Sequence, residues 1–445
     1  MKIFRHEYYT LAVLTIVAVV NYIDRQSLAI LQIPIKHDLH LSDGQLGALT
    51  GLSFAILYCT LALPIAWVAD RQKRTFVVAG SLAVWSAMTA GTGFATGFAL
   101  LVLFRMGVAL GEAGCVPATH SLIADNFWPH QRATAISILS LSFPVGIMLG
   151  FISGGWLSET LGWRHAFIVL GLGGLCLVPL VLSLKEPVRG ATDAAPTRAP
   201  APSAKDALRV LWELRTFRHA TWGCALVGYA LYATLNWNAP FYNRVFNIPI
   251  KDLGGYLALI SGVGGGIGVL LGGVAAARLG KIDSRWYMWV PAIAATAAVP
   301  FIFAQYFLDN ARLSLALAFV PAILLNSFVP PLVATAQSLV PANQRAFTSA
   351  VLVLIVNIIG LGLGPYVTGA ISDLLTSSFG MEQNSLRYAI PSATIVLLWG
   401  VAHLLRAAAS LPEELKSAVL AREVADQKTM AMVSAKARSG QVEAI

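Results

Sequence analysis

The sequence predicts an all-α membrane protein with twelve transmembrane helices arranged in two six-helix halves. Of its 445 residues, 57% are hydrophobic and only 12% are charged, whereas soluble domains are about 45–50% apolar and about 25% charged. Apolar runs near the roughly 20 residues that span a bilayer as a helix recur along the whole chain. This composition excludes a sizeable soluble catalytic or nucleic-acid-binding domain.

Hydropathy, with Pro, Gly and charged residues as boundaries, places the spans in order. The expected spans are 8–32, 44–68, 75–95, 97–125, 132–157, 164–184, 219–242, 253–278, 286–306, 312–338, 345–372 and 387–408. Lys2 and Arg5 precede the first span without a small-residue cleavage site, so we expect a retained helix and not a signal peptide. The chain divides into an N-terminal bundle (1–184), a cytoplasmic linker (185–218), a C-terminal bundle (219–408) and a cytoplasmic tail (409–445).

Two polar segments lie outside the spans. The linker contains the Pro/Ala stretch 194–202, which cannot be helical throughout. The tail starts at Ser410 with a Ser-Leu-Pro-Glu capping-box pattern, which predicts a short helix on the cytoplasmic membrane surface. Beyond Met432 we expect disorder.

Basic residues are distributed unevenly between the two sides of the membrane. The net charge is +9, and 23 of the 31 Lys and Arg residues lie in the N-terminus, the even-numbered loops and the tail. Six lie in the odd-numbered loops, and Arg25 and Arg105 lie inside spans. Because cytoplasmic loops are enriched in Lys and Arg, we expect a multi-pass protein of the cell membrane with both termini cytoplasmic. The same rule explains the basic charge with no nucleic-acid partner.

The two halves share sequence patterns. The loop at 66–74 is similar to 273–281, and 128–133 is similar to 340–346, as in a parallel repeat of six spans. Glycines four residues apart recur in spans 4, 5, 8 and 11, at Gly107 and Gly111, at Gly146, Gly150 and Gly154, at Gly264, Gly268 and Gly272, and at Gly360 and Gly364. They predict close helix packing. A second possibility is that spans 5 and 8, and spans 2 and 11, also slide along such surfaces as the halves rock.

Four ionisable residues lie deep in the predicted membrane: Asp24 and Arg25 in span 1, and Arg105 and Glu112 in span 4. Each costs about 2.5–3.5 kcal/mol at a helix centre on insertion scales, so such residues normally face a cavity and have partners. Arg105 and Glu112 lie two turns apart, too far to pair directly, and Asp24 is the natural partner on another span. Either Asp24 and Arg105 form a static ion pair, or the carboxylates exchange protons during anion transport.

The loop after span 2 resembles the cytoplasmic signature of major facilitator transporters, in which an acidic residue at a helix end pairs with basic residues and a neighbouring helix dipole. It contains Asp70, Arg71 and Arg74, and Arg132 lies in the second duplicated segment. The resemblance implies a cytoplasmic gate formed by these four residues. A plain cluster of positive charges on the cytoplasmic side is the alternative.

Four stretches resemble the spinster-like branch of this superfamily, and the first is shared in form with its anion:cation symporter branch. They are Asn21-Tyr22-Ile23-Asp24-Arg25, Gly111-Glu112-Ala113, Ile123-Ala124-Asp125-Asn126-Phe127 and Phe143-Pro144-Val145-Gly146. The resemblance implies a transporter of lysophospholipids or sphingosine phosphate. It also implies that Asp24 and Glu112 are proton-site carboxylates with Arg105 as their partner, and we place Arg25 in the same proton-coupling group.

We expect both halves to contact the substrate. The candidates are Tyr22, Arg25, Arg105 and Glu112 in the first half, and Tyr229, Tyr232, Asn236, Asn326 and Asn357 in the second. For the second set, packing, interfacial aromatic belts and interhelical hydrogen bonds are the alternative explanation.

The sequence therefore predicts a secondary transporter that works by alternating access. We expect a monomer, without a cofactor or a metal site, that moves a lysophospholipid or a similar amphiphilic anion in a proton-coupled cycle. A proton symporter of a small water-soluble organic anion is the second candidate. A non-transporting receptor or scaffold on the same fold and a membrane-embedded enzyme are remote alternatives, and the sequence contains no P-loop or HExxH motif.

Overall fold

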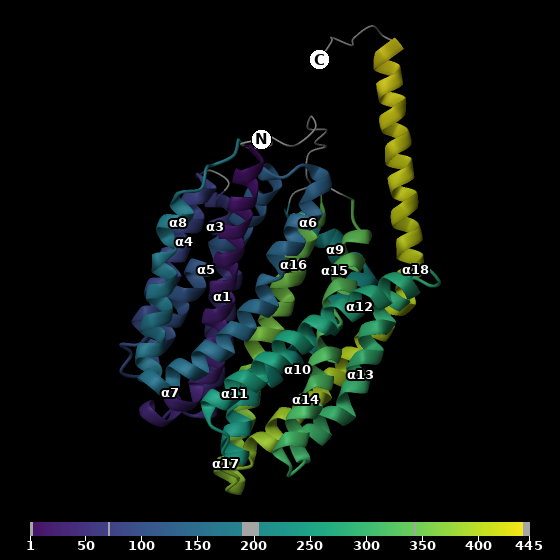
Figure 1. The fold of residues 1–445 in the computed structure, drawn as a ribbon. Helices are drawn as coiled ribbons and strands as arrows, with labels where there is room; N and C mark the ends of the chain where they lie inside the picture. Colours follow the sequence, from purple (N-terminus) through teal and green to yellow (C-terminus); the bar gives the residue numbers. More distant parts are fainter. Residues whose placement is uncertain (1–2, 70–71, 189–203, 342–343, 439–445) are drawn as a thin grey trace.

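A computed structural model describes residues 3–69, 72–188, 204–341 and 344–438. Throughout these residues the chain is built from helices joined by short turns (Figure 1). The first half contains α1 (Ile3–Leu39), α2 (Asp43–Gly47), the π-helical η1 (Ala48–Leu52), α3 (Ser53–Ala69), α4 (Arg74–Thr92), α5 (Phe98–Asn126), α6 (Pro129–Ser140), α7 (Ser142–Cys176) and α8 (Val178–Leu182).

The second half follows a short linker helix, α9 (Ala204–Glu213). It contains α10 (Arg215–Phe246), α11 (Ile250–Leu257), the π-helical η2 (Ala258–Gly264), α12 (Gly265–Leu279), α13 (Trp286–Phe307), α14 (Ala311–Asn326), α15 (Val329–Ser338), α16 (Arg345–Val356), the π-helical η4 (Asn357–Leu363), α17 (Gly364–Phe379) and α18 (Ser385–Arg438).

The described helices cross the membrane twelve times, as the sequence predicts. Ten stretches are long and apolar enough to span a bilayer. One of them, Thr134–Leu182, is 49 residues long and reverses direction at Gly162, whose φ of 80° is a backbone conformation that favours glycine, so it supplies two crossings. The twelfth is α10, a 32-residue helix whose buried residues include amides and hydroxyls.

The starts of α1 and α9 and the end of α18 lie on one side of the molecule, which we call the terminal face (Figure 1). The opposite side, with the turn at Gly162 and the start of α11, is the distal face. The two halves contact each other mainly toward the distal face, where α2 and η1 pack on α17, and α7 packs on α11 and η2. Toward the terminal face α6 packs chiefly on α1, α5 and α7 of its own half.

The predicted glycine ladders pack helices within each half. A Cβ at Gly111 of α5 would lie 2.6 Å from the backbone nitrogen of Trp85 in α4, and a Cβ at Gly364 of α17 would lie 2.6 Å from the carbonyl oxygen of Tyr229 in α10. Side chains at these positions would force apart helices of the same half. The ladders therefore make each half rigid.

Other glycines allow the close approach between the halves. A Cβ at Gly51 in η1 would lie 2.6 Å from the carbonyl oxygen of Leu361 in η4. A Cβ at Gly254 in α11 would lie 2.5 Å from the carbonyl oxygen of Phe151 in α7. The expected pairing of span 2 with 11 and of span 5 with 8 is thus present, but the contact is made chiefly by glycines outside the ladders.

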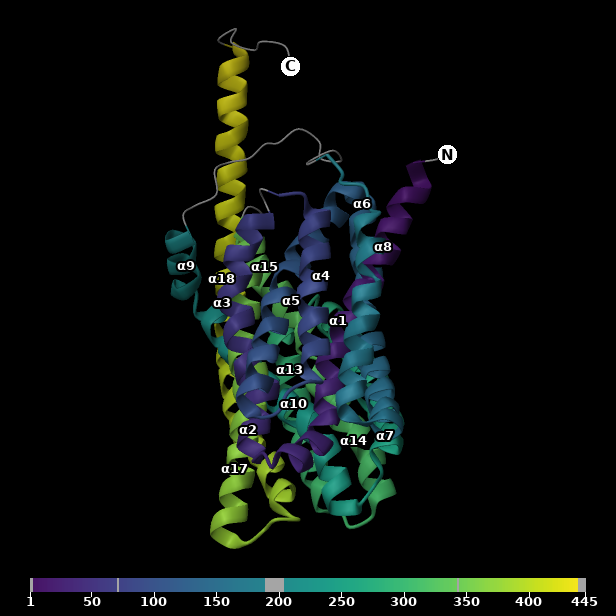
Figure 2. The same ribbon diagram turned by 90° about the vertical axis from the view of Figure 1, so that its left-hand side faces the viewer.

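The tail differs from the sequence expectation. We expected a separate short helix starting near Ser410 and disorder beyond Met432, but α18 continues as one helix from the last span to Arg438 and projects from the terminal face (Figure 2). The helix continues through Pro412, although an interior proline removes one backbone hydrogen bond and its ring crowds the carbonyl four residues earlier. In the linker, residues 189–203 lie outside the described residues.

Candidate functional site

The buried charges of the first half are organised around one ion pair between α1 and α5. Nη2 of Arg25 lies 2.6 Å from Oε2 of Glu112, and its Nε donates to the same oxygen at 2.7 Å. The Glu112 side chain is fully buried, whereas 21% of the Arg25 side chain is exposed. A carboxylate removed from water needs such a charged partner, because an unpaired buried charge costs several kcal/mol. The pair joins spans 1 and 4 at the point where the sequence concentrates its ionisable residues.

Aromatic rings enclose the guanidinium of Arg25. Its carbon lies 4.5 Å from the ring centre of Phe54, 5.0 Å from that of Tyr58 and 5.9 Å from that of Tyr22. The guanidinium of Arg105 lies 4.7 Å from the same Phe54 ring. Ring faces attract cations without neutralising them, so both guanidiniums keep a positive charge that can still attract an anion.

The expected pairing of Asp24 with Arg105 is not formed. Oδ2 of Asp24 accepts a hydrogen bond from Oγ1 of Thr89 at 3.1 Å, and Arg105 has no ion pair among the described residues. Both side chains nevertheless line one small cavity. The physical reason is the 100° turn per residue of α1, which directs Arg25 toward Glu112 and its neighbour Asp24 toward α4.

Three polar atoms of this group have no hydrogen-bond partner within the described part of the chain. They are Oδ1 of Asp24, Oε1 of Glu112 and Nε of Arg105. Buried polar atoms are normally paired, and exceptions concentrate at functional sites. The arrangement therefore has capacity to accept protons or to bind a further charged group.

The second half has a group of uncharged polar residues beside the interface. Oδ1 of Asn238 accepts hydrogen bonds from Nε2 of Gln305 at 3.0 Å and from the hydroxyl of Tyr306 at 2.6 Å. Asn238, Gln305 and Asn326 line a cavity of about 40 Å³ between the halves, together with Phe143 of α7. Phe143 packs edge-on against Tyr22 at 5.1 Å, so one ring contact links this cavity to the surroundings of Arg25.

The predicted substrate residues fall into two groups. Tyr22 lies beside Arg25, and Tyr232 and Asn326 line the cavity between the halves. By contrast, Tyr229 is in the hydrophobic core, and Asn357 begins η4. The amide of Asn236 donates to the carbonyl of Tyr232 on its own helix. Packing thus places Tyr229 and a local hydrogen bond holds Asn236, whereas a substrate contact of Asn357 stays a prediction.

Of the predicted gate residues, Arg74 and Arg132 lie at the terminal face, and Asp70 and Arg71 lie outside the described residues. Arg74 is buried and forms ion pairs with Asp125 and with Glu186, the latter at 2.7 Å. Arg132 donates from Nε to the carbonyl oxygen of Phe127 at 3.1 Å. These contacts connect helices of the first half to each other.

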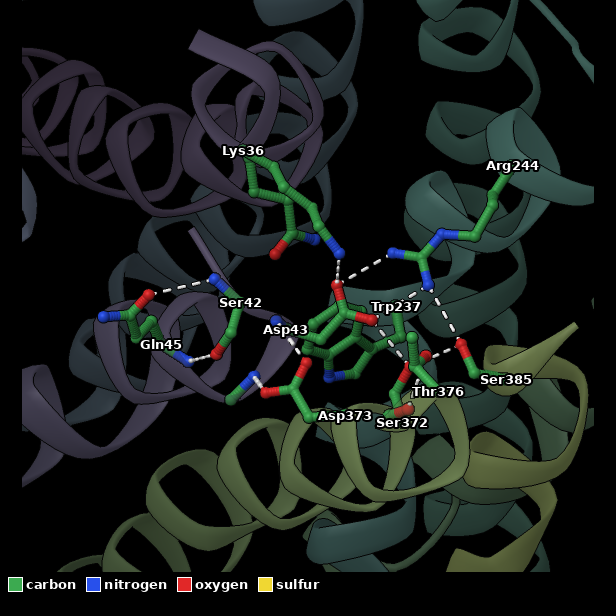
Figure 3. Close-up of polar contacts among 12 residues, drawn as sticks. Lys36, Ser42, Asp43, Gln45, Trp237, Arg244, Ser372, Asp373, Thr376 and Ser385 are labelled. Atoms are coloured by element: carbon green, nitrogen blue, oxygen red, sulfur yellow. Dashed lines mark hydrogen bonds and ion pairs between the residues drawn. The ribbon is translucent and has the colours of Figure 1, made fainter. Parts of the chain in front are cut away.

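Sequence reasoning missed a charged cluster at the distal face, drawn in Figure 3. Arg244 of α10 binds Asp43 of α2 through two bonds, Nη2 to Oδ1 at 2.8 Å and Nη1 to Oδ2 at 2.9 Å. Lys36 of α1 pairs with the same carboxylate, and the hydroxyl of Ser372 in α17 donates to it at 2.6 Å. Asp43 is 1% exposed and thus joins the two halves from within. We call Lys36, Asp43, Arg244 and Ser372 the distal cluster.

A second carboxylate of the other half binds the beginning of α2. Oδ1 of Asp373 accepts from the backbone nitrogen of Asp43 at 2.8 Å, and Oδ2 accepts from that of Gly44 at 2.7 Å. The first N–H groups of a helix have no partner within the helix, so an acidic side chain stabilises them. The sequence signal for this site was the Ser42–Gln45 capping box, which starts the span but does not identify its partner in the other half.

Comparison with known proteins identifies the family. The Major Facilitator Superfamily model matches residues 14–365. An MFS-type efflux pump of Mycolicibacterium smegmatis is 33% identical over 379 residues, which cover 85% of this chain and 87% of that protein. The chain belongs to the major facilitator superfamily.

The spinster-like resemblance is also confirmed. Protein spinster homolog 3 of Danio rerio is 26% identical over 94% of this chain and 88% of its own length. A bacterial homologue of the human lysosomal transporter spinster, solved in an inward-facing and unoccupied conformation, superposes with a TM-score of 0.83 at 27% identity, covering 92% of this chain and 98% of that one. This major facilitator is therefore a membrane-embedded secondary transporter and not an enzyme.

Proposed function

We propose that this major facilitator transports an amphiphilic anion, such as a lysophospholipid, in a cycle coupled to protonation of Glu112. The observation that carries the proposal is the pair between the fully buried Glu112 and the partly exposed Arg25. Its cation is enclosed by aromatic rings and remains reachable, which suits a ligand with an anionic headgroup and an apolar chain. The resemblance to spinster-like transporters implies the same substrate class.

Proton coupling follows from competition for one guanidinium. When Glu112 is ionised, it occupies Arg25; when it takes up a proton, Arg25 is released and can bind an anionic headgroup. Protonation and anion binding therefore favour each other, because each removes the cost of leaving a charge unpaired in a buried site. Asp24 offers a second protonation site, and Arg105 stabilises whichever carboxylate is ionised.

We infer the orientation of the protein in the membrane from the distribution of its basic residues. The terminal face carries the linker and the loops with the larger share of Lys and Arg, so we place it in the cytoplasm, with the protein in the cell membrane. The contacts at the distal face then close the outer side. We therefore assign an inward-facing conformation, and the likeness to a bacterial spinster homologue solved in an inward-facing state supports this assignment.

A small water-soluble organic anion is the second candidate, favoured by one observation. The cavity between the halves is lined by the amides of Asn238, Gln305 and Asn326, which suit a compact polar solute more than an acyl chain. The ring of Phe143, which lines the same cavity, and the ring of Tyr22 packed against it favour the amphiphile.

The test is ligand binding as a function of pH. Purified protein in nanodiscs is titrated with lysophosphatidylglycerol, with citrate and with the zwitterionic lysophosphatidylcholine, and thermal stabilisation reports binding. We expect lysophosphatidylglycerol to bind more tightly as the pH falls and Glu112→Gln to bind tightly at every pH, because its neutral amide leaves Arg25 free.

The matched control for this test is Glu159→Gln, which removes an exposed carboxylate at the distal face. This variant should keep the wild-type pH dependence. Persistence of that dependence in Glu112→Gln would exclude Glu112 as the coupling group. Stabilisation by citrate and not by the lipid would favour the second candidate.

A further inference from the structure

A large cavity lies at the distal face beside the distal cluster. Its volume is about 570 Å³, and both halves line it, with Gln32 and Lys36 from α1 and Trp237 and Arg244 from α10. Gln32 and Trp237 are fully buried and form its floor, whereas Glu382 at its rim is exposed. We call this space the distal cavity. It is separate from the surroundings of Arg25 and Glu112 and is enclosed by different residues.

Two cations that hold the halves together also line the distal cavity. Within the described chain, the side-chain bonds of Arg244 to Asp43 and Ser385 use three of the five N–H groups of its guanidinium. The ammonium of Lys36 uses one of its three N–H groups, on Asp43. About 19% of the Arg244 side chain and 30% of the Lys36 side chain are exposed. Both cations thus have donors left for a ligand in the cavity.

The acidic residues that line the cavity, Asp373 and Glu382, form no ion pair with Lys36 or Arg244 within the described chain. Asp373 lines the cavity, but both of its carboxylate oxygens accept from backbone N–H groups at the start of α2. Glu382 is at the exposed rim, where water screens its charge. Ile33, Leu46 and Pro240 supply apolar lining, and Asn243, Asn247, Thr376 and Gln383 supply uncharged polar groups. The cavity therefore offers two cations within a mixed polar and apolar lining, which suits the anionic headgroup of an amphiphile.

We propose that the distal cavity is a second anion site, in which a phosphate or carboxylate headgroup binds Lys36 and Arg244 and thereby opens the distal face. Because Arg244 and Asp43 belong to different halves, their bidentate pair is a tie across the interface. An anion bound through the unused donors of Lys36 and Arg244 draws both cations toward the cavity and repels the Asp43 carboxylate, which weakens this pair. Ligand on the distal side thus promotes the opening that lets it enter or leave. This inference rests on the proposed amphiphilic-anion substrate.

The experiment measures opening of the distal face by double electron–electron resonance. Spin labels are placed at Thr96 and Ser378, two exposed distal positions in different halves, in full-length protein in nanodiscs with Cys176→Ser to remove the exposed native thiol. The probes are lysophosphatidylglycerol, lysophosphatidylcholine with the same acyl chain, and inorganic phosphate. We expect lysophosphatidylglycerol to raise the long-distance population about threefold or more and lysophosphatidylcholine to leave it unchanged.

Inorganic phosphate distinguishes the two sources of the anion. If it also opens the distal face, the site recognises any such anion; if only lysophosphatidylglycerol acts, the site recognises a lipid headgroup together with its chain. Either result supports the site. An equal response to lysophosphatidylcholine, or no response to either anion, overturns it.

Two variants locate the effect. Lys36→Gln should lose the response to lysophosphatidylglycerol, whereas Arg387→Gln, which removes a distal cation paired with Asp309 inside the second half, should keep it. A response that survives Lys36→Gln at the wild-type size overturns the proposal. The size-exclusion profile and thermal unfolding of each variant establish that it is folded.

A third variant separates this site from the central one. The double variant Arg25→Gln with Glu112→Gln removes the central pair and should retain distal opening by lysophosphatidylglycerol. If opening disappears in this background, the anion acts at Arg25 and the distal site is wrong, while the proposed function stands. If the pH dependence of binding fails but distal opening persists, the proposed coupling is wrong and the distal site stands.

Discussion

The substitution Asp43→Asn tests whether the distal cluster holds the distal face closed. Asn keeps the size of the side chain and its bond with Ser372 but removes the charge that attracts Lys36 and Arg244. The Asn amide has one acceptor oxygen where the carboxylate has two, so one of the two bonds from Arg244 is lost, and hydrogen bonds to charged groups contribute about 1.5–3 kcal/mol. The closed state should therefore lose stability relative to the distal-open state.

The partial exposure of the two cations limits this loss. About 19% of the Arg244 side chain and 30% of the Lys36 side chain are exposed to water, so the lost attraction to Lys36 adds little. We therefore expect the closed state to lose about 2 kcal/mol of stability in total. This free energy changes the ratio of the two states roughly 30-fold, because every 1.4 kcal/mol is about tenfold. A distal-open population of about 1% would become roughly a quarter of the molecules.

Distances between spin labels at Thr96 and Ser378 measure this population without added ligand. The control is Asp309→Asn, which removes a carboxylate that is 90% exposed and paired with Arg387 within the second half. It should leave the distance distribution unchanged. If Asp43→Asn gives the wild-type distribution as well, the distal cluster does not hold the halves together and the reasoning from its buried charge is wrong.

The remaining predictions concern three other sites. Glu112→Gln should abolish proton-driven accumulation in liposomes yet retain counterflow, which needs no net proton movement; proton-driven uptake at the wild-type rate would contradict the coupling role. A Cβ added at Gly254 would lie 2.5 Å from the carbonyl oxygen of Phe151, so Gly254→Leu should push α11 away from α7 and favour the distal-open state in cross-linking assays. Unaltered cross-linking would show that the close contact of α11 with α7 does not hold the distal face closed. Burial alone would raise the pKa of Glu186, but the N–H of Thr75 and the Arg74 guanidinium outweigh it and hold the pKa below its usual value. Its stabilising effect is therefore present at neutral pH and lost as the pH falls through that lowered pKa, so Glu186→Gln should lower the unfolding temperature at pH 7 and converge with wild type in acid; an equal difference at both pH values would exclude an electrostatic cause.

The sequence predicts the twelve crossings and the residues that carry charge, because both depend on local composition. It does not predict which charges meet. Asp24 and Arg25 are neighbours, and only the rotation of α1 within its bundle, fixed by packing against α5 and α7, decides that Arg25 and not Asp24 faces the partner helix. Hydropathy contains no information about that rotation.

The distal cluster escaped sequence analysis for a different reason. Lys36, Asp43 and Arg244 lie near helix ends, where charged residues are common and usually solvated. They matter because Asp43 in α2 and Arg244 in α10, which are 201 residues apart in the sequence, are brought together across the interface between the halves. No local sequence pattern marks such a pairing, whereas a charged residue inside an apolar span, such as Glu112, can be recognised from the sequence alone.

The unequal division of charge between the halves gives the protein an electrical polarity. At mid-depth the first half carries Asp24, Arg25, Arg105 and Glu112, while the facing residues of the second half are neutral amides and hydroxyls. A transmembrane voltage acts on charge, at about 2.3 kcal/mol per elementary charge per 100 mV. With all four residues ionised these charges sum to zero, so the voltage exerts no net force on them. In the proposed cycle, each proton taken up by Asp24 or Glu112 leaves the first half with one net positive charge at mid-depth, and the membrane potential then pulls on that half and not on the neutral residues that it meets.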